Sequence, residues 1–146
     1  PVDIIDRFKE YGCNILMGAE KGMWPPTEFS GLYEQKKVTS SFRYLNSGTY
    51  FGYLYAVKWH LNNIIKSNYQ NGIDDQGQWS IEYLLHDDIK LDTEQRLFYS
   101  TYQSKDGFVL EQGLVNFNYA NPFIIHDNGG HDELTTKLTE YINENS

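Results

Sequence analysis

Short apolar runs alternate with segments of helical periodicity along almost the whole chain, and this alternation constrains the fold more than any other feature. Runs typical of buried strands occupy residues 14–19, 42–46, 89–91, 97–102, 108–115 and 123–125. Apolar residues recur at helical spacing over residues 2–11, over 54–67, from Asp74 or Asp75 to about His86, and from Leu134 to Ile142. The alternation predicts a layered α/β domain.

Residues 20–41 interrupt this pattern. They contain Gly22, Pro25, Pro26 and Gly31 and few periodic apolar positions. We expect a long surface loop here, of the kind that forms lids or binding loops in compact domains.

An aromatic run over residues 42–45 ends in Asn46, Ser47 and Gly48 and resumes at Tyr50. It predicts a buried strand, an abrupt turn and a second apolar element. A glycine beside small polar side chains lets another group come close. We therefore expect these three residues to line a ligand site, with a plain loop as the alternative.

Three polar segments each follow a predicted strand. They are Glu20, residues 46–48 and residues 126–129. In α/β domains ligands gather beyond the carboxyl ends of strands. We therefore expect the three segments to share one cleft.

His126 follows three apolar strand-forming residues and precedes Asp127, Asn128, Gly129 and Gly130. A neutral imidazole at a strand end is a good ligand for Mn²⁺ or a similar cation, and the glycines free backbone N–H groups to approach an oxyanion. The alternative is an exposed histidine in a turn.

A metallohydrolase cluster of His126, His131 and Asp132 is a further hypothesis. The five-residue spacing does not place both imidazoles on one helix face, which disfavours it.

Asp74 and Asp75 permit two interpretations. They can cap a helix and favour its first turn through the helix dipole. They can also be a carboxylate pair in a polar site, with Gln76 as an amide partner and one acid acting as a base or orienting a sugar hydroxyl. The two interpretations are compatible.

Trp24 lies in the proline-bearing segment, where an exposed ring suits stacking on a sugar or a base. A hydrophobic contact under the loop is the alternative. Glu20 either hydrogen-bonds a ligand hydroxyl or is simply solvated.

The chain of 146 residues carries a net charge of −8, which disfavours nucleic acid and anionic membrane surfaces as partners. A bound divalent cation would still draw a phosphate to an acidic cleft. Its one cysteine, Cys13, excludes an internal disulfide. No apolar run is long enough to cross a bilayer and no signal peptide is visible, so we expect a cytoplasmic or reducing compartment.

Four segments resemble the glycosyltransferase domain of the procollagen lysyl hydroxylase family in order and spacing, over nearly the whole chain. Residues 44–53 read Tyr-Leu-Asn-Ser-Gly-Thr-Tyr-Phe-Gly-Tyr, similar to the family's Phe-Leu-Asn-Ser-Gly-Gly-Phe-Ile-Gly-Tyr. The family also has Ala-Glu followed by Trp-Pro, an acidic run ending in Asp-Gln before an aromatic helix, and a closing His-Gly-Asn-Gly. The similar segments here are Ala19-Glu20 with Trp24-Pro25, Asp74-Asp75-Gln76 with Trp79, and His126-Asp127-Asn128-Gly129.

The resemblance implies a GT-A fold, a mixed sheet flanked by helices, that uses a UDP-sugar and Mn²⁺. It implies His126 as a metal ligand, with Asn128 and Gly129 near the diphosphate. Glu20 and residues 46–48 would line the donor-sugar and acceptor region, Asp74 and Asp75 would hold sugar hydroxyls or serve catalysis, and Trp24 would belong to a loop over the donor. The family's sugars are galactose or glucose, and its acceptor is hydroxylysine in collagen-like chains.

Two departures stand out. No Asp-x-Asp strand precedes residue 1, so we expect residues 1–146 to be a single C-terminal, acceptor-side part of the domain, without the N-terminal nucleotide-binding half. Asp132 stands where the family has a lysine, so a diphosphate there would meet a negative charge. The sequence predicts a metal-dependent hexosyltransferase, with a non-catalytic carbohydrate- or collagen-binding module as the alternative.

Overall fold

A computed structural model describes residues 3–24, 29–67, 73–104, 107–111, 114–118, 121–127 and 133–145. Its helices are α1 (Ile4–Glu10), α2 (Ser30–Gln35), α3 (Leu54–Ser67), α4 (Asp75–Leu85) and α5 (Glu133–Asn145). Its strands are β1 (Ile15–Glu20), β2 (Tyr44–Gly52), β3 (Ile89–Leu91), β4 (Phe98–Ser100), β5 (Phe108–Glu111), β6 (Leu114–Phe117) and β7 (Ile124–His126). The predicted α/β class is confirmed.

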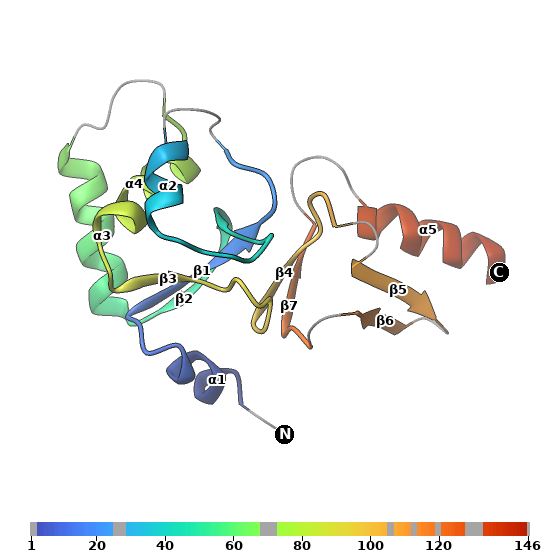
Figure 1. Cartoon of the computed structure of the whole chain (residues 1–146). Coiled ribbons are helices and arrows are strands. Elements are labelled where there is room, and N and C mark those ends of the chain that lie inside the picture. The colour runs from blue at the N-terminus through green and yellow to red at the C-terminus, as the bar shows by residue number, and fades with distance from the viewer. Residues whose placement is uncertain are drawn as a thin grey trace.

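The central sheet has the strand order β2-β1-β3 (Figure 1). Strand β1 is antiparallel to β2 and parallel to β3, so the sheet is mixed. All six residues of β1 are buried, which explains why the strand reads as a continuous apolar run. The polar Glu20 ends this buried strand, and its carboxylate is thereby placed at the edge of the core.

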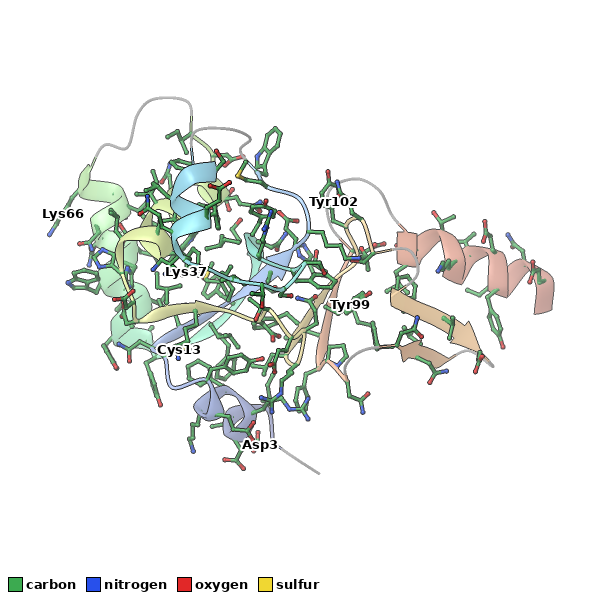
Figure 2. All side chains as sticks on the ribbon, in the orientation of Figure 1. Asp3, Cys13, Lys37, Lys66, Tyr99 and Tyr102 are labelled. Atoms are coloured by element: carbon green, nitrogen blue, oxygen red, sulfur yellow. The ribbon has the colours of Figure 1, made fainter. Side chains whose placement is uncertain are left out.

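Helices cover both faces of this sheet (Figure 1), with side chains packed between the helices and the sheet (Figure 2). On one face Ile15 and Met17 pack into a core with Tyr33 of α2 and Trp79 of α4. On the other face Leu16 packs with Phe8 of α1. The side chains of β1 alternate between the two cores because successive residues of a strand point to opposite faces.

The predicted turn after Asn46 is wrong, because β2 continues through it. Pairing with β1 jumps from Met17↔Tyr50 to Gly18↔Asn46, which leaves residues 47–49 as a bulge on β2. The Asn46 side chain accepts a hydrogen bond of 3.0 Å from the Gly48 N–H and closes the bulge. A Cβ at Gly18 would lie 2.4 Å from Thr49 Oγ1, so Gly18 makes room for it. Bulges commonly redirect side chains next to functional sites.

Two further expectations need correction. The predicted loop over residues 20–41 contains α2, whose formation follows from the burial of Phe29 and Tyr33 against α4 rather than from a periodic sequence. The single strand predicted over residues 108–115 is two strands, β5 and β6, paired antiparallel from Phe108↔Phe117 to Glu111↔Leu114.

Strands β4 and β7 form a parallel pair beside the central sheet, and β5, β6 and α5 lie beyond them (Figure 1). His126 is the last residue of β7 and pairs with Ser100. No helix among the described residues is both long and apolar enough to span a bilayer.

Candidate functional site

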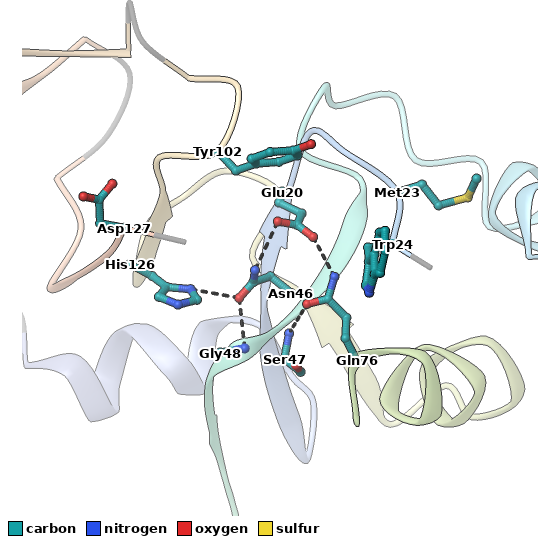
Figure 3. Close-up of a pocket in the computed structure, with 10 residues that line it drawn as sticks. All are labelled: Glu20, Met23, Trp24, Asn46, Ser47, Gly48, Gln76, Tyr102, His126 and Asp127. Atoms are coloured by element: carbon teal, nitrogen blue, oxygen red, sulfur yellow. Dashed lines mark hydrogen bonds between the residues drawn. The ribbon is translucent and has the colours of Figure 1, made fainter. Parts of the chain in front are cut away.

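A cavity of about 620 Å³ opens where β1, β2 and β7 meet the N-terminus of α4. Its volume is in the range of small-molecule sites. It is lined by Glu20, Met23, Trp24, Asn46, Ser47, Gly48, Gln76, Tyr102, His126 and Asp127 (Figure 3). The expectation that three separate segments share one cleft is confirmed for their described residues, Glu20, 46–48 and 126–127, although Asn46 to Gly48 reach it from a bulge and not from a strand end.

A continuous chain of hydrogen bonds crosses the floor of the cavity (Figure 3). His126 Nδ1 lies 3.0 Å from Asn46 Oδ1, and Asn46 Nδ2 donates to Glu20 Oε2 at 3.1 Å. Gln76 Nε2 donates to Glu20 Oε1 at 2.7 Å, and Gln76 Oε1 accepts from the Ser47 N–H at 3.3 Å. We call these five residues the polar relay. Because the Asn46, Glu20 and Gln76 side chains each have two partners, the relay fixes the shape of the cavity floor.

The relay also determines which ring nitrogen of neutral His126 carries the proton. The Asn46 amide has one orientation, since its NH₂ group faces the Glu20 carboxylate and its oxygen accepts from the Gly48 N–H. The partner of His126 Nδ1 is therefore an acceptor, so Nδ1 carries the proton. In the neutral ring Nε2 then holds a lone pair, which is the form that binds a metal.

The environment favours the neutral ring. Burial lowers the pKa of His126, and the nearby Asp127 carboxylate opposes this only in part. The Asp127 carboxylate is itself hydrogen-bonded. Burial raises its pKa, but hydrogen bonds from Thr101, Thr135 and Leu134 outweigh the effect of burial, so the pKa of Asp127 is lowered overall. Asp127 thus ties the end of β7 to the first turn of α5.

Gly48 allows the Cε1 edge of the imidazole to lie close to the bulge. A Cβ built on Gly48 would lie 2.0 Å from His126 Cε1 and 2.6 Å from Nε2. Any other residue at this position would displace the ring. The glycine of the Asn-Ser-Gly motif is therefore required for the approach of β7 to β2, as the motif predicted.

Asp74 and Asp75 lie beside the cavity wall and are not among the residues that line it. Asp74 is the N-cap of α4: its Oδ1 accepts from the Gly77 N–H at 2.8 Å, and its Oδ2 accepts from the Trp24 indole N–H. Asp75 Oδ2 accepts from Ser47 Oγ at 2.9 Å. The capping interpretation is confirmed, and the catalytic one stays a prediction.

Trp24 stands at the rim of the cavity with 54% of its surface exposed. Its indole nitrogen is anchored by Asp74 while its ring remains accessible, which is the arrangement that stacking requires. Glu20 is 3% exposed, so the solvated alternative for this residue is wrong.

The family model described as PLOD GT domain matches residues 1–146. This chain belongs to that family. Sequence similarity agrees with this assignment. The chain is 32% identical over 140 residues to the Drosophila melanogaster procollagen-lysine,2-oxoglutarate 5-dioxygenase, and the aligned region covers 87% of this chain and 19% of that protein. The resemblance predicted from the sequence motifs is confirmed.

Two other relatives extend the comparison. The human multifunctional procollagen lysine hydroxylase and glycosyltransferase LH3 is 28% identical over 155 residues, 97% of this chain and 20% of LH3. The uncharacterized protein R699 of Acanthamoeba polyphaga mimivirus is 28% identical over 138 residues, 93% of this chain and 29% of R699. The chain therefore spans less than a third of each of these relatives.

Within this PLOD GT domain the polar relay joins residues from most of the motifs that carried the resemblance. Asn128 and Gly129, and the hydrolase candidates His131 and Asp132, lie outside the described residues. Met23 and Tyr102 line the cavity but were not predicted from the sequence, where neither carried a signal, whereas Asp127 was expected there as part of residues 126–129.

Proposed function

We propose that this PLOD GT domain is the C-terminal, acceptor-side part of a GT-A glycosyltransferase that moves galactose or glucose from a UDP-sugar to a hydroxyl acceptor. The acceptor class is hydroxylysine in a collagen-like chain. The observation that carries the proposal is the polar relay, which holds His126, a residue that lines the polar cavity, in the tautomer with an unprotonated Nε2.

The cavity residues fit a divalent cation such as Mn²⁺. The relay assigns His126 the tautomer that a metal ligand needs, and its lowered pKa keeps that lone pair available near neutral pH. When bound, the cation would neutralise the developing charge on the diphosphate leaving group. In a chain of net charge −8, the cation also offsets the repulsion between protein and phosphate.

The remaining polar groups suit a sugar. Glu20 is a buried carboxylate oriented by two amides, one from Asn46 and one from Gln76. Such a fixed acceptor favours one hydroxyl geometry, as expected for recognition of a donor hexose or of an acceptor hydroxyl. Ser47 and Gly48 line the same cavity.

Three assignments rest on the family resemblance and complete the proposal. Asp74 and Asp75 hold sugar hydroxyls or accept the proton of the attacking hydroxyl. Trp24 stacks on the donor. Asn128 and Gly129 approach the diphosphate.

The test is Mn²⁺-dependent UDP-hexose hydrolysis by the full-length protein, compared between wild type, His126→Ala and the exposed-surface control Lys58→Ala. We expect hydrolysis that requires Mn²⁺, is lost in His126→Ala and is unchanged in Lys58→Ala. Equal hydrolysis in all three proteins would overturn the role of His126.

Absence of any hydrolysis, together with glycan binding that persists in EDTA, would favour the alternative, a non-catalytic carbohydrate- or collagen-binding module. The half-exposed Trp24 ring would serve that module equally well, whereas His126 would have no part in it.

A further inference from the structure

A second cluster of ligating side chains lies between α3 and α4. His60 of α3 is fully buried, and its Nδ1 lies 2.6 Å from Oε2 of the buried Glu82. His86, the residue that follows α4, places its Nε2 3.5 Å from the same carboxylate oxygen. The three ligand atoms all lie within 4.8 Å of one another. We call these residues the interhelix triad.

The triad is separate from the cavity. Gln76, the residue of α4 that lines the cavity, precedes Glu82 by six positions, which is about 9 Å along a helix axis. None of the triad residues lines the cavity. Its side chains therefore have no part in the proposed transfer reaction.

The buried Glu82 carboxylate of the triad favours a nearby cation. Asp88 also faces His60, with its Oδ1 3.3 Å from Nε2, so one buried imidazole lies between two carboxylates. The Asp88 side chain is 37% exposed, so the buried negative charge is that of Glu82. Uncompensated charge is costly in a protein interior, and a divalent cation would remove it.

The geometry points to a binding site for a divalent transition metal of the zinc class, with His60 Nδ1, Glu82 Oε2 and His86 Nε2 as its protein ligands. Two imidazoles and one carboxylate select Zn²⁺ over Mg²⁺, Ca²⁺ or Mn²⁺, which favour oxygen ligands. Two histidines and one glutamate leave a fourth, open position in tetrahedral coordination.

The distances are close to those that zinc requires. Bond lengths of 2.0–2.2 Å in a tetrahedron separate ligand atoms by about 3.4 Å. The Glu82–His86 separation of 3.5 Å already agrees with this. The His60–Glu82 separation of 2.6 Å is that of a hydrogen bond, and the metal would replace the shared proton while the pair opens by less than about 1 Å.

Asp88 supplies the outer partner that metal-bound histidines usually have. With the metal bound, Asp88 would accept from His60 Nε2–H, which leaves the Nδ1 lone pair for the ion. Asp88 is in turn held by the Asn14 side-chain amide at 3.0 Å.

A metal here would join α3 to α4. The first turn of α4 carries Gln76 of the polar relay, so the joined helices would form a stable support for the cavity. Because the ion binds the folded state and not the unfolded one, it would raise the melting temperature of the protein.

Zinc titration calorimetry on the purified, metal-stripped protein tests the inference. We expect one Zn²⁺ bound with release of at least one proton, counted from the dependence of the enthalpy on the buffer. His86→Ala should abolish this event. Asp88→Asn should weaken it about 10- to 100-fold, and His126→Ala should leave it unchanged. His86 is partly exposed at the end of α4, so the fold should survive its substitution, which circular dichroism will verify.

Each possible outcome either supports or overturns the proposed zinc site. Zinc affinity unchanged in His86→Ala, or lost in His126→Ala, would place the ion elsewhere and overturn the inference. Binding without proton release would also overturn it, since the hydrogen bond between His60 and Glu82 would then be intact. A Co²⁺ derivative of the wild type provides a readout without mutation: a tetrahedral visible spectrum is expected, and an octahedral one would contradict the assignment.

Discussion

At the scale of single residues, the candidate site depends on close contact between His126 and the bulge on β2. The ring of His126 lies against Gly48 and is held by Asn46, so position and tautomer are set together. These contacts predict two effects that can be measured on single variants.

Replacing Gly48 by alanine should displace the imidazole, because the new Cβ would lie 2.0 Å from His126 Cε1. We expect Mn²⁺ affinity to fall by at least about tenfold, in line with the loss of an orienting contact at a metal ligand. The matched control is Gly31→Ala in α2, where a Cβ has nothing within 4 Å. Equal Mn²⁺ affinity in the two variants, measured by paramagnetic water relaxation, would show that Gly48 has no such role.

The pKa of His126 predicts a pH dependence of stability. Because burial lowers this pKa below its ordinary 6.5, the unfolded chain binds the proton first as pH falls. The contribution is complete above about pH 6.5 and is lost progressively below it. Urea unfolding between pH 7 and pH 5 should show a smaller loss of stability in His126→Asn than in wild type. A parallel loss in both proteins would mean that the ring is solvated.

At this scale the sequence predicted part of the candidate site. Glu20, Asn46 and His126 were grouped because each was predicted to follow a strand, and they do meet in one cavity. The interhelix triad was not predicted from the sequence, because His60 lies far along the chain from Glu82 and His86 and in a different helix from Glu82. Only the spacing of Glu82 and His86, one helical turn apart, was visible in the sequence.

At the scale of elements, α4 carries much of the site at its first turn. Asp74 caps the helix and holds Trp24, while Gln76 joins the polar relay. The N-terminus of α4 therefore couples helix stability to the shape of the cavity.

Substitutions of Asp74 separate its capping role from a catalytic one. Asp74→Ala should cost about 0.5–2 kcal/mol of stability through loss of the N-cap, whereas Asp74→Asn keeps a good capping residue and should cost less. Urea denaturation measures both. If Asp74→Asn keeps stability but loses hexose transfer, the carboxylate has a chemical role. If it keeps both, Asp74 is only a cap.

Elements were predictable where the local pattern decided them. Helix α3 begins and ends where its periodicity predicted, and α4 begins at the predicted cap. The bulge on β2 was not predictable, because Asn-Ser-Gly is typical of turns and only pairing with β1 shows that the strand continues. Helix α2 depends on tertiary burial of Tyr33, and the β5–β6 pair depends on contacts across a connection.

At the scale of the whole molecule, the cavity is built between the central sheet and the β4–β7 pair, so the connection between these parts matters. Asp92 secures it. This fully buried carboxylate follows β3 and accepts from the backbone N–H groups of Arg96, Leu97 and Phe98 and from the Tyr11 hydroxyl.

Asp92→Ala should therefore destabilise the whole fold. Three backbone donors would be left unpaired, two of them deeply buried, at a cost of about 1–3 kcal/mol for each buried group. The control is Asp87→Ala, an exposed partner of Lys36 whose loss should change stability by less than about 1 kcal/mol. Similar denaturation midpoints for the two variants would contradict the role of Asp92.

The central claim is that the polar relay presents His126 Nε2 as a metal ligand. Electron spin echo spectroscopy of Mn²⁺, added with UDP to the full-length protein, tests it most directly because the echo detects a coordinated imidazole nitrogen. We predict nitrogen modulation in the wild type that is lost in His126→Ala. The same modulation in both proteins, or none in the wild type, would contradict the account.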